Sequence, residues 1–250
     1  MPARGETTAP VARRDSVLTP KDEEIAPGQT VRLFPARGRE SARILAFHGG
    51  GGVAGEPGVL GMLLRHVGQH GGITSAAASY RTLKTAPGAT LDDMLADAVT
   101  ALDWMCETGN SGAPIYLLGA SFGGLLALHA ALARPDAAAG LVLLNPVTNT
   151  GPGGFANRVV QPERHEKLSP LARFEGADLV TRLRCLILHG TADDVVPIEH
   201  SRRFAALWPD DRCRLVETEG AVHGYFNRAP HLATAAETIA NAVTRVPRDR

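Results

Sequence analysis

Residues 115–123 read Ile-Tyr-Leu-Leu-Gly-Ala-Ser-Phe-Gly, and this stretch decides the fold. The apolar run 115–118 predicts a short buried strand, and residues 122–133, rich in small apolar side chains, predict a helix. The G-x-S-x-G pattern between them puts Ser121 in a sharp strand-to-helix turn, where larger side chains at the flanking glycines would collide with strand and helix. Such a turn exposes the hydroxyl at the carboxyl edge of a sheet, with a helix N-terminus behind it that favours developing negative charge. The stretch therefore predicts a nucleophilic serine, and the alternative is a glycine-rich turn that happens to carry one.

On both sides of this turn, short apolar stretches alternate with amphipathic ones. Short apolar strands that alternate with helices indicate an α/β fold, with a mostly parallel sheet flanked by helices on both faces. Strands are expected over residues 29–34, 43–47, 73–80, 115–118, 141–144, 186–188 and 214–216, and helices over 59–67, 91–105, 122–133, 201–208 and 232–243.

The length of 250 residues suits one sizeable domain and leaves little room for a second. Residues 1–27 are polar and punctuated by prolines, so we expect a flexible N-terminal tail followed by a catalytic domain over residues 28–246. Residues 147–181 are rich in Gly, Pro and charge and are too long for a simple connection. We interpret them as an irregular segment and a candidate lid insertion.

A second glycine-rich stretch, His48-Gly49-Gly50-Gly51-Gly52, also follows a predicted strand directly. Glycines let backbone N–H groups approach the oxyanion of a tetrahedral intermediate without obstruction by side chains. The expected donors are the N–H groups of Gly50, Gly51 and Phe122. A flexible glycine loop is one alternative; a phosphate-binding loop is another, but the chain lacks G-x-x-x-x-G-K-[ST] and Rossmann spacing. His48 is interpreted as a loop-orienting residue.

Candidates for the acid and the base follow later strands. In the stretch 189–197, either Asp193 or Asp194 could reach a histidine, and either could instead cap the following helix. Among the nine histidines, only His223 both follows the acid and lies just beyond a strand end, next to a glycine. The order serine, acid, histidine is the one expected for this architecture. A neutral imidazole would accept the proton of Ser121, and the carboxylate would fix its tautomer.

The composition limits the classes of binding partner that we expect. Lys and Arg number 26, as do Asp and Glu, so a net charge of zero gives no reason to expect nucleic acid or an anionic membrane surface. Cys106, Cys185 and Cys213 form neither a zinc motif nor a disulfide framework. We find no signal peptide and no apolar run long enough to span a membrane, so we expect a cytoplasmic protein. We also expect no metal and no organic cofactor. The sequence does not specify the oligomeric state.

The motifs HGGGG, GASFGG, HGTADDVVP and AVHGYFN together resemble the α/β-hydrolase esterases. The resemblance is closest to the carbohydrate-esterase (acetyl-xylan-esterase-like) and hormone-sensitive-lipase-like branches, and it covers roughly residues 29–245. Tyr80-Arg81, the run 90–93 and the Ser-Pro-Leu element at 169–171 are similar to elements of that family. Matching the HGTAD motif implies that the acid is Asp193 rather than Asp194.

The chain departs from the lipase-like branch in two ways that bear on the substrate. Phe122 stands beside the nucleophile in place of a small residue, and only about 28 residues precede the first predicted strand, so the long N-terminal cap has no counterpart. The resemblance implies an α/β-hydrolase fold and a serine carboxylic-ester hydrolase that acts on small-molecule, short-acyl esters through an acyl-enzyme. A peptidase, amidase or thioesterase with the same triad is the alternative, and a non-catalytic ligand-binding protein is a third reading.

Overall fold

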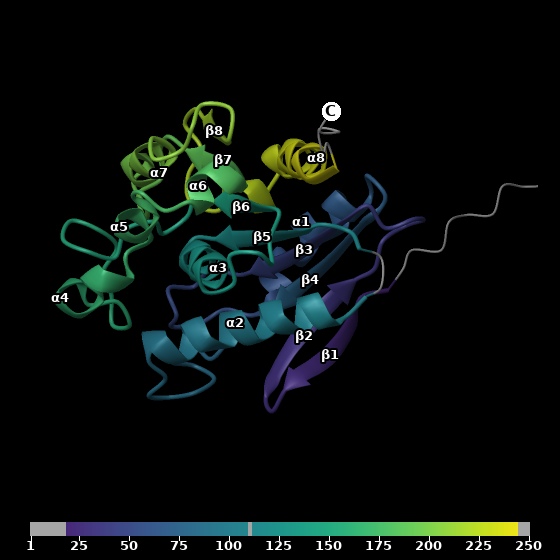
Figure 1. Ribbon diagram of the computed structural model, residues 1–250, viewed down its shortest axis with the longest axis horizontal. Coiled ribbons are helices and arrows are strands. Elements are labelled where there is room, and N and C mark those ends of the chain that lie inside the picture. The colour runs from purple at the N-terminus through teal and green to yellow at the C-terminus, as the bar shows by residue number, and fades with distance from the viewer. Residues whose placement is uncertain (1–18, 110–111, 245–250) are drawn as a thin grey trace, which may run out of the picture.

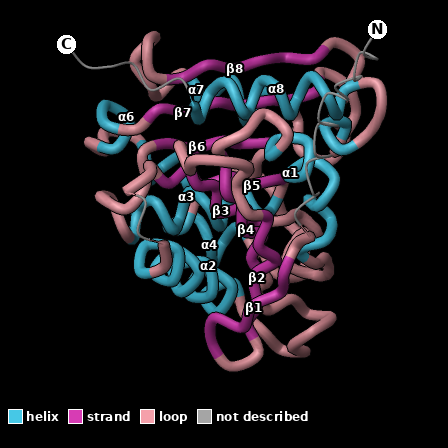
Figure 2. The backbone as a smooth tube through the Cα atoms, turned by 90° about the vertical axis from the view of Figure 1, so that its right-hand side faces the viewer, coloured by secondary structure: helices cyan, strands magenta, loops and turns pink. Residues whose placement is uncertain are grey.

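Eight strands form one sheet in the order β1-β2-β4-β3-β5-β6-β7-β8 within residues 19–109 and 112–244, which the computed structural model describes. Figure 2 shows the strands side by side in this spatial order, from β8 at one edge of the sheet to β1 at the other. The strands are β1 Lys21–Ala26, β2 Gln29–Phe34, β3 Ala42–Phe47, β4 Ile73–Ala78, β5 Ile115–Ala120, β6 Gly140–Leu144, β7 Arg184–Gly190 and β8 Cys213–Thr218.

From β4 to β8 every neighbouring pair is parallel, whereas β2 runs antiparallel to both β1 and β4. Strands β3, β5 and β6 lie in the middle of the sheet, and all of their residues are buried. A strand covered on both faces needs apolar side chains at nearly every position, which explains why these segments are apolar runs rather than alternating patterns. The prediction of a mostly parallel sheet is confirmed.

Helices cover both faces of the sheet (Figure 1). On one face α1 and α8 pack together, with Leu64 and Ile239 in one apolar cluster. On the other face α2, α3 and α7 contribute Met94, Leu125 and Phe204 to a second cluster. These elements are η1 Pro57–Leu60, α1 Gly61–Gly68, α2 Leu91–Glu107, α3 Phe122–Ala133, α7 Ile198–Ala205, η3 Tyr225–Asn227 and α8 His231–Thr244. Across the described residues, no helix has both the length and the apolar character needed to cross a membrane.

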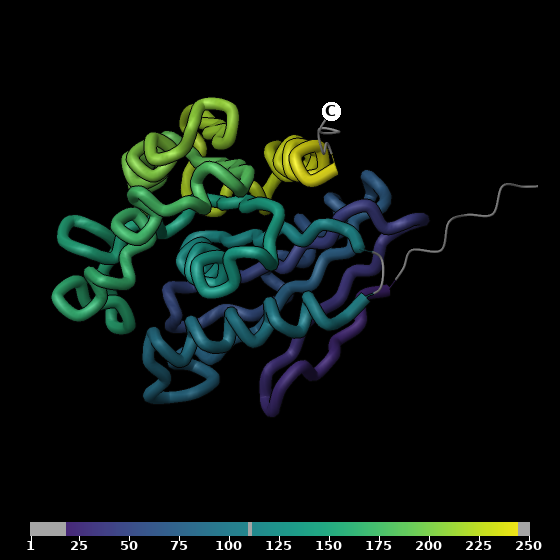
Figure 3. Tube along the Cα trace, viewed as in Figure 1, coloured from purple at the N-terminus to yellow at the C-terminus, as the bar shows by residue number. Residues whose placement is uncertain are grey.

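The expectation that residues 1–27 form a flexible tail is wrong for its last part. Strand β1 pairs with β2 in a hairpin whose turn is Pro27-Gly28, with Gly28 at a φ of 75°. Figure 3 shows this hairpin in purple, at the opposite edge of the sheet from β8. The first four residues of β1 are exposed and polar, as suits an edge strand, so the strand has no apolar alternation by which the sequence could reveal it. Residues 1–18 lie outside the described part of the chain.

The segment between β6 and β7 is more ordered than its composition suggests. It contains α4 Pro162–His165, η2 Glu166–Leu168, α5 Pro170–Phe174 and α6 Leu179–Arg182. The Phe174 ring is fully buried and packs edge-on against Phe204 of α7, with ring centroids 5.2 Å apart. This segment is therefore attached to the domain core, and its behaviour as a lid stays a prediction.

Candidate active site

Ser121 occupies a strained turn between β5 and α3. Its φ of 54° and ψ of −122° lie outside the regions that non-glycine residues ordinarily adopt. Backbone hydrogen bonds to the end of β6 and the residues after it fix this turn. The Ser121 N–H donates to Leu144 O at 2.8 Å, and Ser121 O accepts from the N–H of Val147 at 3.0 Å. A Cβ at Gly123 would overlap the carbonyl of Phe47 in β3. The close approach of α3 to β3 thus requires a glycine at position 123, as the sequence pattern predicted.

Asp193 and His223 meet at the carboxyl ends of β7 and β8. His223 Nδ1 lies 2.7 Å from Asp193 Oδ2. The Asp193 side chain is fully buried, while that of His223 is 23% exposed. Because a carboxylate only accepts hydrogen bonds, Nδ1 carries a proton, and in the neutral form of the ring Nε2 holds the lone pair. The neighbouring Asp194 is exposed to solvent, so the structure brings Asp193 and not Asp194 to the histidine.

The buried carboxylate of Asp193 has further hydrogen-bond partners. Its Oδ1 accepts from the N–H groups of Val195 at 2.9 Å and Val196 at 2.8 Å. His189 Nε2 lies 3.3 Å from Oδ2 and 2.8 Å from Val196 O, so this nitrogen is the protonated one. Burial alone would raise the pKa of Asp193, but the hydrogen bonds from His189, His223 and the two backbone N–H groups outweigh it and hold the pKa well below its usual range. The acid is therefore ionised near pH 7.

Asn145 is a member of this site that the sequence analysis missed. Its Nδ2 donates to Asp193 Oδ2 at 2.7 Å, and the residue is fully buried directly after β6 with a φ of 45°. Asparagine tolerates this left-handed conformation better than most residues. The available signal was its position, since polar residues at the carboxyl ends of adjacent parallel strands gather at one edge of the sheet. His189, the penultimate residue of β7, carried the same signal.

A cavity of about 300 Å³ brings the nucleophile candidate and the base candidate together. Ser121 and His223 both line it, with Gly50 from the glycine loop and apolar side chains from η1 and η3, of which Phe226 is one. Gly51 is not among its lining residues, and its carbonyl instead accepts from Asn157 Nδ2 at 2.8 Å. None of the described residues of 147–181 lines this cavity. The segment instead contacts the glycine loop, through the hydrogen bond from Asn157 to the Gly51 carbonyl.

Tyr80 and His48 hold the other side of the glycine loop. The Tyr80 hydroxyl donates to His48 O at 3.0 Å and lies 3.2 Å from Gly49 O, and the two rings stack with centroids 4.3 Å apart. His48 Nδ1 donates to Gly49 O at 2.7 Å, which agrees with the interpretation of His48 as a loop-orienting residue. Burial lowers the pKa of His48 to about 4, so the imidazole is neutral near pH 7.

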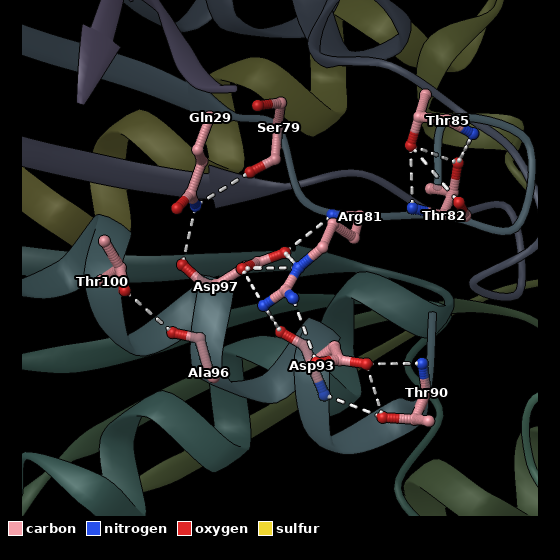
Figure 4. A network of polar contacts seen from close by, with 10 residues as sticks. All are labelled: Gln29, Ser79, Arg81, Thr82, Thr85, Thr90, Asp93, Ala96, Asp97 and Thr100. Carbon is pink, nitrogen blue, oxygen red and sulfur yellow. Dashed lines mark hydrogen bonds and ion pairs between the residues drawn. The ribbon is translucent and has the colours of Figure 1, made fainter. Parts of the chain in front are cut away.

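Arg81 fixes the chain immediately after Tyr80 to α2 (Figure 4). Its guanidinium reaches Asp97 at 2.7 Å and Asp93 at 3.0 Å, while the Arg81 N–H also donates to Asp97 at 2.8 Å. Asp93 in turn accepts from the N–H of Thr90 and completes the capping box that starts α2. The Tyr-Arg pair therefore anchors the glycine loop with one side chain and a core helix with the next.

Residues 44–184 match a family model described as the alpha/beta hydrolase fold. This range is more than half of the chain, and the chain belongs to that family. The predicted α/β-hydrolase fold is confirmed. The comparison with curated proteins found no significant match.

Solved structures with the same fold include esterase 2 from the Planctomycetes species Thermogutta terrifontis. Its native form gives a TM-score of 0.72 at 24% identity, over 94% of this chain and 96% of that one. The form phosphoramylated by tabun gives a TM-score of 0.76 at 23% identity, over 95% and 98% of the two chains. Other structures of this esterase hold propionate or butyrate, or are phosphorylated by paraoxon. At this level of identity the likeness establishes a shared fold over nearly the whole length of both chains.

Proposed function

We propose that this protein is a serine carboxylic-ester hydrolase that acts on short-acyl esters through an acyl-enzyme. The observation that carries the proposal is one arrangement of three side chains. Ser121 lines a cavity together with His223, and His223 is hydrogen-bonded at 2.7 Å to the buried carboxylate of Asp193. This is the combination of nucleophile, base and orienting acid that acyl transfer requires.

In the proposed reaction, His223 Nε2 takes the proton of the Ser121 hydroxyl as the serine oxygen attacks the ester carbonyl carbon. Asp193 keeps the Nδ1–H tautomer in place and stabilises the imidazolium that forms. The imidazolium then gives the proton to the departing alcohol, which leaves an acyl group on Ser121. A water molecule, deprotonated by the same nitrogen, then attacks the acyl carbon. The bond from that carbon to the Ser121 oxygen breaks, the imidazolium returns the proton to Ser121, and the acid is released.

The oxyanion donors are proposed to be backbone N–H groups of Gly50, Gly51 and Phe122. Phe122 is the first residue of α3, so its N–H has no acceptor within the helix and adds to the positive end of the helix dipole. The N–H groups of Gly50 and Gly51 donate to no acceptor among the described residues, so both are available. Gly50 is the stronger of the two candidates, because it lines the cavity beside Ser121 and Gly51 does not.

The size and lining of the cavity support a short acyl group. A volume of about 300 Å³ lies at the lower limit of ordinary ligand pockets. Val59, Leu60 and Phe226 give it apolar walls, and Arg228 and His223 are the two lining side chains able to carry positive charge. The structurally similar Thermogutta esterase with bound propionate and butyrate agrees with this substrate size.

The test is hydrolysis of p-nitrophenyl acetate by the wild type and by Ser121→Ala, with paraoxon labelling read by peptide mass spectrometry. We expect a loss of at least about 10⁴-fold in kcat/KM for Ser121→Ala, together with loss of a label that in the wild type lies on the peptide containing Ser121. Full activity in the variant would remove Ser121 as the nucleophile. A labelled wild type that cleaves p-nitrophenyl thioesters or anilides faster than the matched ester would favour the thioesterase or amidase alternative.

A further inference from the structure

The candidate active-site cavity has an uneven distribution of charge. None of the described residues that line it is an aspartate or a glutamate. Arg228 is the one lining residue whose side chain is always charged, whereas His223 is charged only when its ring binds a second proton. A cavity lined in this way favours an anionic group on a bound molecule over a cationic one.

The backbone of Arg228 is held in place at the end of η3. Its N–H donates to Tyr225 O at 3.1 Å, and its carbonyl accepts from the N–H groups of His231 and Leu232 at 2.9 Å each. Both backbone polar groups are therefore used by η3 and the start of α8, while the residue as a whole is exposed. The side chain is thus the part of Arg228 that can meet a ligand at the cavity.

Short, hydrogen-bonded elements connect Arg228 to the rest of the cavity wall. Asn227 Nδ2 donates to Val59 O at 3.2 Å and so joins η3 to η1, and both of these residues line the cavity. Helix η3 also occupies three of the four residues between His223 and Arg228. The guanidinium therefore belongs to the same small cavity as Ser121 and His223, within the reach of one bound molecule.

The protein itself does not neutralise this charge. Across the part of the chain that the structure describes, no carboxylate forms an ion pair with Arg228. Glu56, which precedes η1, lies near Arg32 instead, because a Cβ at Gly58 would meet Glu56 Oε1 at 3.2 Å and Arg32 Nη1 at 3.1 Å. The carboxylate of Asp193 is buried and already hydrogen-bonded. The charge of Arg228 is therefore available to a ligand.

We propose that Arg228 makes this site selective for esters that carry a carboxylate, an inference that rests on the proposed ester hydrolysis. The guanidinium presents N–H donors in a planar fork that matches the two oxygens of a carboxylate. A carboxylate bound at Arg228 leaves the ester group of the same molecule in the cavity that Ser121 and His223 line. Because this contact is made equally in the ground state and the transition state, it acts mainly on KM. The carboxylate belongs either to the alcohol part or to the acyl part of the ester, and the experiment separates these two sources.

The experiment compares two pairs of esters, and the members of each pair differ only in a carboxylate or its neutral amide. In 4-acetoxybenzoate and 4-acetoxybenzamide the group is on the alcohol, and in monophenyl succinate and phenyl succinamate it is on the acyl chain. We measure kcat/KM from the released phenol for the wild type and Arg228→Gln, and divide the loss on the charged ester by the loss on its amide. This quotient cancels the intrinsic reactivity of the esters.

We expect a quotient of about three to ten for at least one pair, carried by KM, as suits a charge-assisted contact at an exposed arginine. The quotient should shrink between about 20 mM and about 500 mM NaCl, because salt screens an exposed charge. Arg228→Lys should restore most of the preference by restoring the charge, and Arg228→Glu should reverse it.

The matched control is Arg203→Gln, which removes an exposed arginine of α7 that does not line the cavity and should give a quotient of about one. A quotient of about one for both pairs in Arg228→Gln, while the wild type hydrolyses the neutral esters and Ser121→Ala does not, overturns the selectivity and leaves the proposed function intact. Hydrolysis of none of the four esters by the wild type overturns the proposed function, and this inference with it.

Discussion

Replacement of Asp193 by asparagine gives the sharpest test of the site. Both carboxylate oxygens are in use: Oδ1 accepts from two backbone N–H groups, and Oδ2 accepts from His223 and Asn145 at 2.7 Å each. Asparagine has nearly the same shape but one acceptor oxygen fewer, so an NH₂ group must face donors at one of the two positions. Asp193→Asn therefore removes the charge and the acceptor that hold the His223 tautomer.

Loss of the orienting carboxylate in this kind of triad costs about 10⁴-fold in rate, or about 5.5 kcal/mol of transition-state stabilisation. We expect Asp193→Asn to lower kcat/KM for p-nitrophenyl acetate by about that factor. The matched control is Asp194→Asn, which changes an exposed carboxylate one residue away and should leave kcat/KM within about twofold of the wild type. Equal losses in the two variants, or the reverse order, would refute the assignment of Asp193.

The same variant has a signature in stability against pH. Because the pKa of Asp193 is held well below that of the unfolded chain, its ionised form stabilises the fold above the unfolded pKa of about 3.9, and this contribution is lost as the pH falls below it. In urea unfolding, the free-energy difference between wild type and Asp193→Asn should therefore shrink between about pH 5 and pH 2. A difference that stays constant over this interval would contradict the hydrogen-bond arrangement described here.

Three further predictions concern the residues that support the site. Asn145→Ala should lower the free energy of unfolding by about 1.5–3 kcal/mol, measured in urea, because it removes a hydrogen bond to the buried Asp193 carboxylate; an unchanged midpoint would count against that bond. Since burial lowers the pKa of His48 to about 4, stability should fall as the pH drops from about 6.5 to 4, by about 3 kcal/mol more in the wild type than in His48→Gln. Arg81→Gln should cost about 1–3 kcal/mol by leaving Asp97 without its ion pair, while paraoxon labelling of the native protein persists; loss of labelling under native conditions would assign Arg81 a role beyond anchoring.

The central part of the fold could be predicted because burial leaves a direct trace in the sequence. Strand β5 and helix α3 follow from an apolar run and a small-residue helix on either side of Ser121, and the structure bounds α3 at the predicted residues. Strand β1 left no such trace, because it is held by backbone pairing with β2 and its first four side chains face solvent. An edge strand of this kind obeys no apolar period, so its pattern cannot be told from that of a tail.

The candidate site could be predicted only in part, because motif order identifies some of its residues while burial and sheet order decide the others. His223 was identified by elimination, but spacing alone could not choose between Asp193 and Asp194, because the choice depends on which of two adjacent carboxylates the turn after β7 buries. Asn145 lies 48 residues from Asp193 in the chain and belongs to no motif. Only the sheet order, which places the ends of β6, β7 and β8 side by side, makes these residues neighbours.

The excursion between β6 and β7 sets where this scaffold can accept foreign sequence. Its first residues belong to the candidate site, since Asn145 donates to Asp193 and the Val147 N–H donates to the Ser121 carbonyl. A transplant of this excursion from another member of the family would have to begin beyond Val147 and rejoin before β7. The incoming loop would also have to bring a donor for the Gly51 carbonyl, the task that Asn157 performs here. It would also have to supply an apolar side chain in the place of Phe174, which packs against Phe204 in the core. With these contacts kept, the exposed part of the excursion is open to redesign.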